Sequence, residues 1–342
     1  MSSTTVASGS TQICRVSIII KALNEEKRIA TAVESALRAV QKVGGEVILA
    51  DSCSTDRTVE IAARYPICIV QLANPAERCC GIGPQLGYQH SSGEFVYILD
   101  GDMEMLDGFL EPALAFMASN PDVVGVGGQV LEQNTESLEY RARMERASSH
   151  MQAGAVDRLD MGGLYRRSAI EKAGYFSNRN LHSYEEVDLA VRLRAVGGRL
   201  WRLPIPSVNH HGHDAPPYQL LMRRWRSRYI CGLGELLRAA IGRSHLSLIL
   251  RDVKELRIYT AVIFWWLFMG TIIFWPMAVL SKIVLLIISL CFPFLLMTWR
   301  KKSLEKALFS VVSWCLNSAG FIRGFVALQR SPIDSVKSNI IN

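Results

Sequence analysis

Apolar and polar positions alternate along residues 14–130 in the rhythm of short strands separated by amphipathic helices. Runs of aliphatic and β-branched residues predict buried strands at 14–20, 46–50, 67–73, 94–99 and 123–130. Segments with helical spacing of apolar residues lie between them, at 24–41, 54–65 and 107–119, and 81–93 includes a further helix or loop. This order is typical of an α/β domain with helices on both faces of a mostly parallel sheet.

The first predicted helix, 24–41, has the clearest pattern. Ile29, Val33, Leu37 and Val40 fall on one face of it, which we expect to pack on the sheet. Asn24 stands at its start and is expected to be the N-cap, because an Asn side chain accepts a hydrogen bond from the first helical amides.

A long apolar stretch lies in the C-terminal third of the chain. Between Ile258 and Trp299 the only charged residue is Lys282. About 20 apolar residues cross a bilayer core, so the sequence predicts two membrane-spanning helices, 258–281 and 283–299, joined as a hairpin. The weaker apolar segment 307–328 contains polar residues and predicts an interfacial helix.

The positive charge is concentrated just before this hairpin. Residues 199–257 contain 11 Lys and Arg against 4 Asp and Glu, an excess equal to the +7 of the whole chain. "RKK" (300–302) follows the hairpin, so the positive-inside rule places both ends in the cytosol. Lipid headgroups are therefore the expected partner of the basic region, and nucleic acid is excluded because no recognition motif accompanies the charge.

The N-terminal region and the cysteines agree with a cytosolic domain held at the cell inner or plasma membrane. The first apolar run, 16–20, is too short for a secretory signal. The eight cysteines show neither metal-ligand nor disulfide spacing, which indicates reduced thiols. The sequence predicts a loose tail (1–12), an α/β domain (13–230) and a basic membrane-surface region (231–257). A transmembrane hairpin (258–299) and a cytosolic or interfacial tail with an amphipathic helix (300–342) follow.

Three polar loops follow predicted strands, at 21–26, 51–56 and 100–104. In parallel sheets, ligands bind at the carboxyl ends of the strands. The last loop contains Asp100-Gly101-Asp102, and such a D-x-D by itself is typical of a strand-ending turn. Because three polar loops are expected at one sheet edge, a ligand-binding site becomes the preferred interpretation of the D-x-D loop, with Glu104 left to the turn.

The motifs of residues 15–230 resemble those of the inverting family 2 glycosyltransferases, which have the GT-A fold. "SIII..LNEE", "EVILADSCSTDRT", the D-x-D loop, "GGLYRRSAIEKAGYF" and "YEEVDLAVRLRAVG" occur in the order of the family. The resemblance implies a nucleotide-sugar-binding α/β domain and metal-dependent transfer of a sugar from a nucleotide donor, with UDP preferred. Together with the hairpin it implies a membrane-associated, polyprenyl-linked acceptor in glycan or polysaccharide biosynthesis.

The resemblance also implies the donor contacts. Asp51 would pair with the nucleotide base, and Leu23 and Glu25 are the matching contacts in the first loop. Arg78 would meet the diphosphate, although a solvated surface arginine fits the sequence equally well. Helix capping for Glu25 and Asp56 and turn formation for Asp51 are the structural alternatives.

The metal implied is Mg²⁺ or Mn²⁺, because a sugar nucleotide leaves as a diphosphate whose negative charge must be stabilised. Asp102 is the expected metal ligand, Asp100 is positioned for ribose, metal-bound water or metal, and Gly101 lies between them against the donor. The loop 208–214 adds His210, His211 and His213, of which we favour His211 or His213 for the metal or diphosphate shell. A zinc site is disfavoured because no cysteine stands at finger spacing.

For the chemical step an acceptor hydroxyl must lose its proton, and a carboxylate at a helix N-terminus is a suitable base. The family usually has Glu-Asp here, where this chain has Glu185-Glu186, and the alignment places Glu186 in the base position with Glu185 as second choice. Alternatively, Ser183 and Glu186 fit a capping box. Asp188 and Arg192, four residues apart, are expected to form a supporting ion pair.

"QLLMRRWRSRY" (219–229) is similar to the Q-x-x-R-W signature of processive polysaccharide synthases, but three residues separate Gln219 from Arg223. Processive synthesis is therefore not predicted. Arg223 and Arg224 remain candidates for diphosphate or acceptor contact, and a basic amphipathic helix on anionic lipid is the alternative.

Three other functions are compatible with parts of this sequence. A polyprenyl-phosphate acceptor would need little help from a base, because its attacking oxygen is anionic. A nucleotidyltransferase is disfavoured because "KALNEE" lacks a glycine-rich triphosphate loop, although Lys21 stands where the family commonly has Pro. A non-catalytic nucleotide-sugar-binding membrane scaffold would bind a donor without consuming it.

Overall fold

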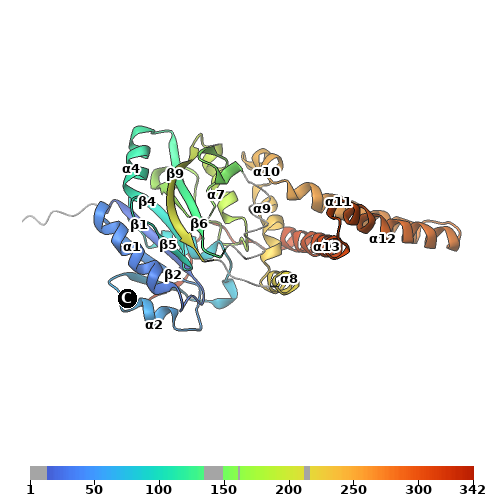
Figure 1. Cartoon of the computed structure of the whole chain (residues 1–342), viewed down its shortest axis with the longest axis horizontal. Helices are drawn as coiled ribbons and strands as arrows, with labels where there is room; N and C mark the ends of the chain where they lie inside the picture. Colours follow the sequence, from blue (N-terminus) through green and yellow to red (C-terminus); the bar gives the residue numbers. More distant parts are fainter. Residues whose placement is uncertain (1–13, 135–148, 161, 212–215) are drawn as a thin grey trace, which may run out of the picture.

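The computed structural model describes residues 14–134, 149–160, 162–211 and 216–342. An α/β body forms one end of the molecule and a helical hairpin projects from the other (Figure 1). The predicted loose tail, 1–12, lies outside the described residues. The strands of the body are β1 (Val16–Ala22), β2 (Gly45–Asp51), β3 (Cys68–Leu72), β4 (Phe95–Asp100), β5 (Met103–Met105), β6 (Val123–Glu132), β7 (Gly154–Val156), β8 (Gly163–Arg166), β9 (Arg199–His210) and β10 (Ser338–Ile340).

The helices of the body cover both faces of the sheet, as predicted. They are α1 (Ile29–Val43), α2 (Thr58–Ala62), η1 (Pro75–Glu77), α3 (Ile82–Gln89), α4 (Leu110–Ser119), η2 (Ser149–Met151), α6 (Arg167–Lys172), α7 (Glu185–Ala195), α8 (Pro217–Arg226), η3 (Tyr229–Cys231), α9 (Gly232–Ala240) and α10 (Leu246–Asp252). α1 and α4 contribute to the core on one face, and α3, α6 and α7 contribute to the core on the other.

All described strands belong to one sheet in the order β10-β3-β2-β1-β4-β8-β6-β9-β5, with β7 paired to β9. The prediction of a mostly parallel sheet holds for β3, β2, β1 and β4. Beyond β4 the sheet is mixed, because β8 pairs antiparallel with both β4 and β6. The register puts Lys21 opposite Asp100, Ala22 opposite Asp51, and Asp51 opposite Gln71, so functional candidates from distant loops become neighbours.

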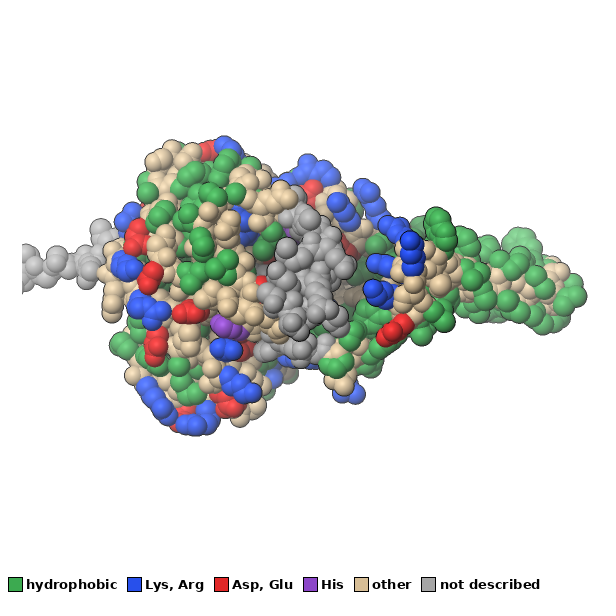
Figure 2. All heavy atoms as spheres, viewed as in Figure 1, with side chains coloured by type: hydrophobic (Ala, Val, Ile, Leu, Met, Phe, Trp, Pro, Cys, Tyr) green, Lys and Arg blue, Asp and Glu red, His purple; other side chains and the backbone are tan. Residues whose placement is uncertain are grey.

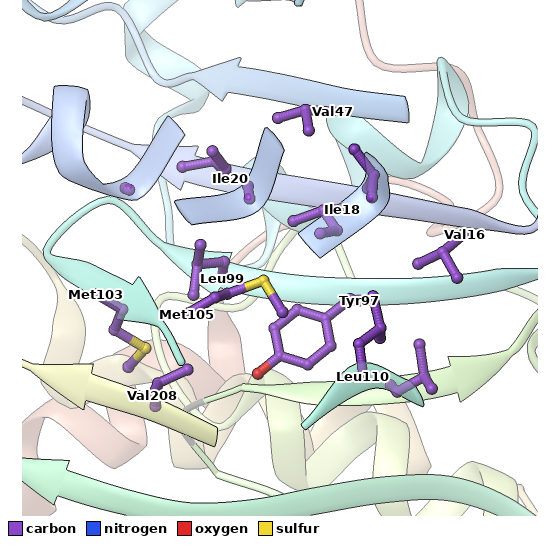
Figure 3. Packing of buried hydrophobic residues seen from close by; sticks show 14 of the residues in the cluster. Val16, Ile18, Ile20, Val47, Tyr97, Leu99, Met103, Met105, Leu110 and Val208 are labelled. Atoms are coloured by element: carbon purple, nitrogen blue, oxygen red, sulfur yellow. The ribbon is translucent and has the colours of Figure 1, made fainter. Parts of the chain in front are cut away.

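The core explains why the central strands are apolar on both sides. Ile18 and Ile20 of β1 pack on one face with Tyr97 and Leu99 of β4 (Figure 3). Ile19 packs on the other face. A strand buried on both faces has no polar side to present, which is why "VSIII" reads as a continuous apolar run.

The predicted start of the first helix is wrong. α1 begins at Ile29, and Asn24 has a positive φ of 60° instead of capping it. The side-chain oxygen of Asn24 accepts a hydrogen bond from the Thr55 amide at 2.7 Å, so it joins two loops. The predicted apolar face is confirmed, since Ile29, Val33 and Val40 are buried and Leu37 packs beside them.

The hairpin consists of α11 (Glu255–Phe274) and α12 (Val279–Lys301), which are long and apolar enough to cross a membrane. Only 17% and 6% of their most apolar windows are buried, so these helices do not form the core of the body. Figure 2 shows their green apolar surface projecting from the body, with Lys and Arg side chains gathered at the junction. The turn falls between Phe274 and Val279, before the predicted break at Lys282, because Pro276 cannot continue the helix.

The segment after the hairpin returns to the body. α13 (Leu304–Val326) packs against α9, α11 and α12. Its approach to the body requires glycine, because a Cβ on Gly324 would fall 2.0 Å from the Cys231 carbonyl oxygen. Its position relative to lipid, expected to be interfacial, stays a prediction.

Residues 327–342 are bound along the body, which the sequence did not predict. β10 pairs antiparallel with β3 and forms the edge of the sheet. Val336 is 1% exposed, and its backbone exchanges hydrogen bonds with the Gln89 side chain at 2.7 and 2.9 Å. Figure 1 places the C-terminus beside α2, far from the tip of the hairpin.

Candidate active site

The loops after β1 and β2 are joined by hydrogen bonds between them. The Asn24 and Glu25 amides donate to the hydroxyls of Ser54 and Thr58 at 2.9 and 2.7 Å. Asp56 accepts hydrogen bonds from the Glu26 amide at 3.0 Å and from the Thr58 hydroxyl at 2.5 Å. Asp56 therefore fixes the shape of this edge of the sheet.

Asp51 is fully buried at the end of β2. Its Oδ2 accepts hydrogen bonds from the Ser54 amide at 3.0 Å and from the Gln71 side chain at 2.9 Å. Its Oδ1 has no hydrogen-bond partner among the described residues. A buried carboxylate oxygen without a donor is costly, so Asp51 retains the capacity to accept a hydrogen bond from a ligand.

Lys21, the departure from the family pattern, links the D-x-D loop to the predicted base. Its Nζ lies 3.1 Å from Asp100, 3.3 Å from Glu185 and 3.9 Å from Glu186. Burial by itself would lower the pKa of Lys21, but the three carboxylates raise it well above its usual value. The cluster is therefore held by one ammonium group surrounded by acids.

Two carboxyl groups of this cluster, those of Glu186 and Asp100, have raised pKa values. Burial and the neighbouring Glu185 raise the pKa of Glu186 to about 8, although Lys21 opposes the shift. Burial raises the pKa of Asp100, again against the effect of Lys21. A carboxyl group whose pKa lies near the working pH is suited to exchanging a proton.

Asp102 lies beside His210, which was not the histidine favoured from the sequence. His210 Nε2 is 3.5 Å from Asp102, and His210 Nδ1 is 2.8 Å from Glu132. Burial would lower the pKa of His210, but hydrogen bonds to the two carboxylates raise it to about 9. His211 contacts Asp102 through its backbone, donating its amide to the Asp102 carbonyl at 3.2 Å. His213 lies outside the described residues.

The first loop packs closely on the D-x-D loop. A Cβ on Gly101 would fall 2.8 Å from Glu25 Cγ, so any other residue at this position would require the Glu25 side chain to move. Burial and the nearby Asp102 and Asp100 raise the pKa of Glu25 to about 7, whereas Arg223 lowers it. Leu23 is 38% exposed at the rim.

α7 positions both candidate bases, and its N-terminus does not form the alternative capping box. The N-cap is Tyr184, with φ 67° and no side-chain cap, and the Ser183 hydroxyl donates to the Tyr229 carbonyl at 2.7 Å. Asp188 and Arg192 form the expected ion pair at 2.8 Å. Arg192 also donates to the Tyr175 and Phe176 carbonyls, so the pair anchors the helix.

Backbone strain is concentrated around these loops. Of the five described non-glycine residues with positive φ, three stand in the loops of this site, namely Asn24, Cys53 and Tyr184. Each such residue costs roughly 1–3 kcal/mol, and strain of this kind clusters at functional sites.

The three predicted arginines lie at the periphery of the cluster. Arg78 donates to the Cys53 carbonyl at 2.6 Å, on the side of the Asp51 loop. Arg223 and Arg224 belong to α8, where Arg224 lies over the Tyr229 ring at 5.1 Å. An open groove of about 790 Å³ follows α8 and is lined by Tyr218, Met222 and Arg223 among others.

The described residues contain no cage of three or more His, Cys, Asp or Glu side chains for a metal ion. Two carboxylates, Asp100 and Asp102, nevertheless stand at the end of one strand. Mg²⁺ commonly takes one or two carboxylates together with substrate phosphates instead of a cage made wholly of protein. The oxygen donors present fit such a cation, provided that a diphosphate completes its shell.

Sequence reasoning missed two supporting residues. Glu132 ends β6 and reaches His210, and Gln71 lies beside Asp51 through the pairing of β2 and β3. Neither belongs to a readable motif, because both act through strands that are distant in the sequence.

Residues 17–174 match a family model described as glycosyl transferase family 2. A relative from Bacillus subtilis with the name "Putative glycosyltransferase EpsE" is 28% identical over 201 residues, which cover 55% of this chain and 70% of the relative. Probable glucomannan 4-beta-mannosyltransferase 1 of Arabidopsis thaliana is 27% identical over 155 residues, 42% of this chain. The match spans only 27% of that plant protein.

Two solved structures share the fold. A mannosyltransferase from Pyrobaculum calidifontis, in complex with GDP-Man and Mn²⁺, has a TM-score of 0.56 at 17% identity and covers 92% of this chain and 88% of its own. S. aureus TarS 1–349, in complex with UDP-GlcNAc, has a TM-score of 0.51 at 18% identity and covers 95% of this chain and 96% of its own.

Proposed function

Residues 17–174 belong to glycosyltransferase family 2, and from this premise we propose that the protein is a metal-dependent inverting glycosyltransferase acting at a membrane. It would transfer a sugar from a nucleotide donor to a membrane-associated, polyprenyl-linked acceptor in glycan or polysaccharide biosynthesis. The GT-A fold expected from the sequence is confirmed by the shared architecture. The observation that carries the proposal is the Lys21 cluster, which brings Asp100 of the D-x-D loop together with Glu185 and Glu186 of α7.

Glu186 is the proposed base. Its side chain is 31% exposed, so an acceptor hydroxyl can approach it, whereas that of Glu185 is 9% exposed and is held by Lys21. With its pKa at about 8, Glu186 can take the hydroxyl proton as the oxygen attacks the anomeric carbon. The sugar–phosphate bond breaks on the opposite face, which inverts the anomeric configuration.

The donor is proposed to lie along the strand ends. The unpartnered Oδ1 of Asp51 would accept a hydrogen bond from the base, and Leu23 and Glu25 would flank the nucleoside. Solved relatives of the fold hold UDP-GlcNAc in one case and GDP-Man in another, and we propose a UDP-linked donor for this chain. Arg223 and Arg224 of α8 would face the diphosphate or the acceptor.

Asp102 and Asp100 are the residues proposed to hold Mg²⁺ or Mn²⁺. The cation would neutralise charge that develops on the departing diphosphate. His210 is proposed to support the site, since it holds Asp102 in place from the side of Glu132.

The acceptor is proposed to come from the membrane. The α8 groove contains the apolar side chains of Tyr218 and Met222 beside Arg223. Tyr218 packs edge-on against Phe309 of α13 with ring centroids 5.1 Å apart, so the groove adjoins α13, the helix that packs against the hairpin. A lipid-linked acceptor at the cytosolic face of an inner or plasma membrane suits this arrangement.

The experiment supplies labelled UDP-, GDP- and dTDP-sugars with Mn²⁺ or Mg²⁺ and membrane lipid extract to the purified full chain in detergent. We expect labelled lipid product from one donor, and roughly 10²–10⁴-fold slower product formation after Glu186→Gln. Binding of a donor without its consumption would instead support the scaffold, and release of pyrophosphate from a nucleoside triphosphate would support a nucleotidyltransferase. Replacing the extract by polyprenyl phosphate separates the two acceptor classes.

A further inference from the structure

A second polar cavity lies outside the Lys21 cluster. It has a volume of about 170 Å³ and is lined by Arg78, Arg179, Arg228, Arg330 and other residues. These arginines come from the loop before α3, the loop before α7, the α8–η3 junction and the tail after α13. Neither the D-x-D carboxylates nor Glu186 line it. Of the residues expected from the sequence to contact the donor, Arg78 lines it, and the Arg78 side chain donates to the Cys53 carbonyl at 2.6 Å.

The cavity has an excess of positive charge. Glu77 is shared, with Arg179 and Arg330 each 2.7 Å from one of its oxygens. The other carboxylate of the cavity, Glu235, accepts hydrogen bonds from the backbone amide of His182 at 2.9 Å and binds its ring at 2.8 Å. Both acids are thus already engaged by other residues.

Arg78 and Arg228 have no ion pair with Asp or Glu in the part of the chain that the structure describes. The Nε of each is buried and has no hydrogen-bond partner among the described residues. A guanidinium stays charged at any physiological pH, and a buried N–H without an acceptor costs roughly 1–3 kcal/mol. In addition, Arg228 is held at a strained φ of 63°.

We propose that this cavity is a binding site for a phosphate-type anion, separate from the sugar-nucleotide site. Two arginines without carboxylate partners can offer paired N–H donors to phosphate oxygens, the geometry for which guanidinium is best suited. The cavity has room for several water molecules and hence for a phosphate or a diphosphate, but it is too small for a whole nucleotide.

Occupancy of this site would act on two neighbouring segments. The tail forms one wall, and it is fastened there by Asn180, which exchanges hydrogen bonds with the Arg330 backbone at 2.8 and 2.9 Å. Arg78 donates to the Cys53 carbonyl in the loop that follows Asp51. A bound anion would hold the tail on the body and stiffen the Asp51 loop.

Binding is tested on the full chain in detergent, independently of the proposed transfer reaction. Inorganic phosphate and pyrophosphate are titrated by calorimetry at constant ionic strength in chloride. We expect binding by the wild type and by the control Arg226→Gln, an exposed arginine of α8, and at least a tenfold weaker affinity in Arg228→Gln. Equal affinity in Arg226→Gln and Arg228→Gln would overturn the proposal.

Arg78→Gln repeats the test from another wall if Arg228→Gln does not fold, and circular dichroism in chloride checks the fold of each variant. Hydrogen exchange of residues 327–342 should slow when phosphate binds. Vesicles with and without phosphatidic acid then show whether the ligand is a lipid headgroup or free phosphate. Binding of either ligand supports the site if that binding requires Arg228. If UDP displaces phosphate competitively, the cavity belongs to the donor site and the proposal of a separate site fails.

Discussion

Lys21 Nζ lies 3.1 Å from Asp100 Oδ1, so an ammonium group at the end of β1 neutralises the first carboxylate of the D-x-D loop. The parallel register of β1 and β4, which puts these residues opposite each other, fixes this relationship. The same Nζ reaches Glu185, and the loops of three elements are thereby held together.

Lys21→Met should lower turnover at pH 7 by about tenfold or more. Burial and Glu185 raise the pKa of Glu186, and the positive charge of Lys21 opposes this shift. Removing the Lys21 charge should therefore raise the pKa of Glu186 above about 8. A smaller fraction of Glu186 is then ionised, and the acidic limb of the rate profile moves to higher pH. Lys42→Met, which removes an exposed pair with Asp107, is the control. An unshifted profile in Lys21→Met would contradict this role.

Glu186→Gln should reduce turnover by roughly 10²–10⁴-fold, the usual contribution of a general base. It should also change how stability depends on pH. Because the folded pKa of Glu186 is raised to about 8, the native state binds the proton more tightly than the unfolded state, and wild-type stability falls as pH rises from about 4.5 to about 8.

The glutamine variant lacks this ionisation, so its Tm advantage over the wild type should grow between pH 5 and pH 8.5. Thermal unfolding across pH measures the difference. The control Glu111→Gln, at an exposed position of α4, should show the same dependence of Tm on pH as the wild type. If Glu186→Gln also showed the wild-type dependence, that result would argue against a raised pKa of Glu186.

Asp102→Asn should abolish metal-stimulated turnover, because one of the two proposed oxygen ligands is weakened. Metal titrations of activity and of Mn²⁺ binding by electron paramagnetic resonance measure the effect. Glu104→Gln provides a matched control two residues further on, where Glu104 accepts a hydrogen bond from Asn209 at 3.1 Å instead of facing the cluster. Full metal response in Asp102→Asn would remove Asp102 from the metal role.

Lysine on the exposed face of the hairpin should weaken membrane association. Phe268 and Ile287 are 54% and 55% exposed, one on each helix. A lysine at the centre of a spanning helix costs about 2.5–3.5 kcal/mol, so the double variant Phe268→Lys, Ile287→Lys should be extracted by carbonate. Leu250→Lys, 52% exposed in α10 outside the hairpin, should remain in the membrane fraction with the wild type.

Val336→Ala should destabilise the body by roughly 1–2 kcal/mol, because it removes two buried carbon atoms where the tail packs on α3. Ile333→Ala changes the same tail at a position that is 72% exposed and should have little effect. Thermal melts compare the two, and equal Tm values would show that the tail does not contribute to the stability of the body.

The sequence by itself determined the elements whose signal is local. The continuous apolar runs of the central strands, the helical face of α1 and the apolar length of the hairpin follow from periodicity, because each element must bury or expose one side of itself. The position of the D-x-D loop at the end of β4 followed in the same way, and the family resemblance supplied the meaning of that loop.

Only the tertiary structure decided which side chains meet. Asn24 was expected to cap a helix but bonds to Thr55. His210, not the favoured His211, places its ring between Asp102 and Glu132 of another strand. The packing of residues 327–342 along the body likewise depends on an edge of β3 that no local pattern reveals. These outcomes arise from strand register and long-range packing, whereas sequence periodicity reports only what each segment requires of its immediate surroundings.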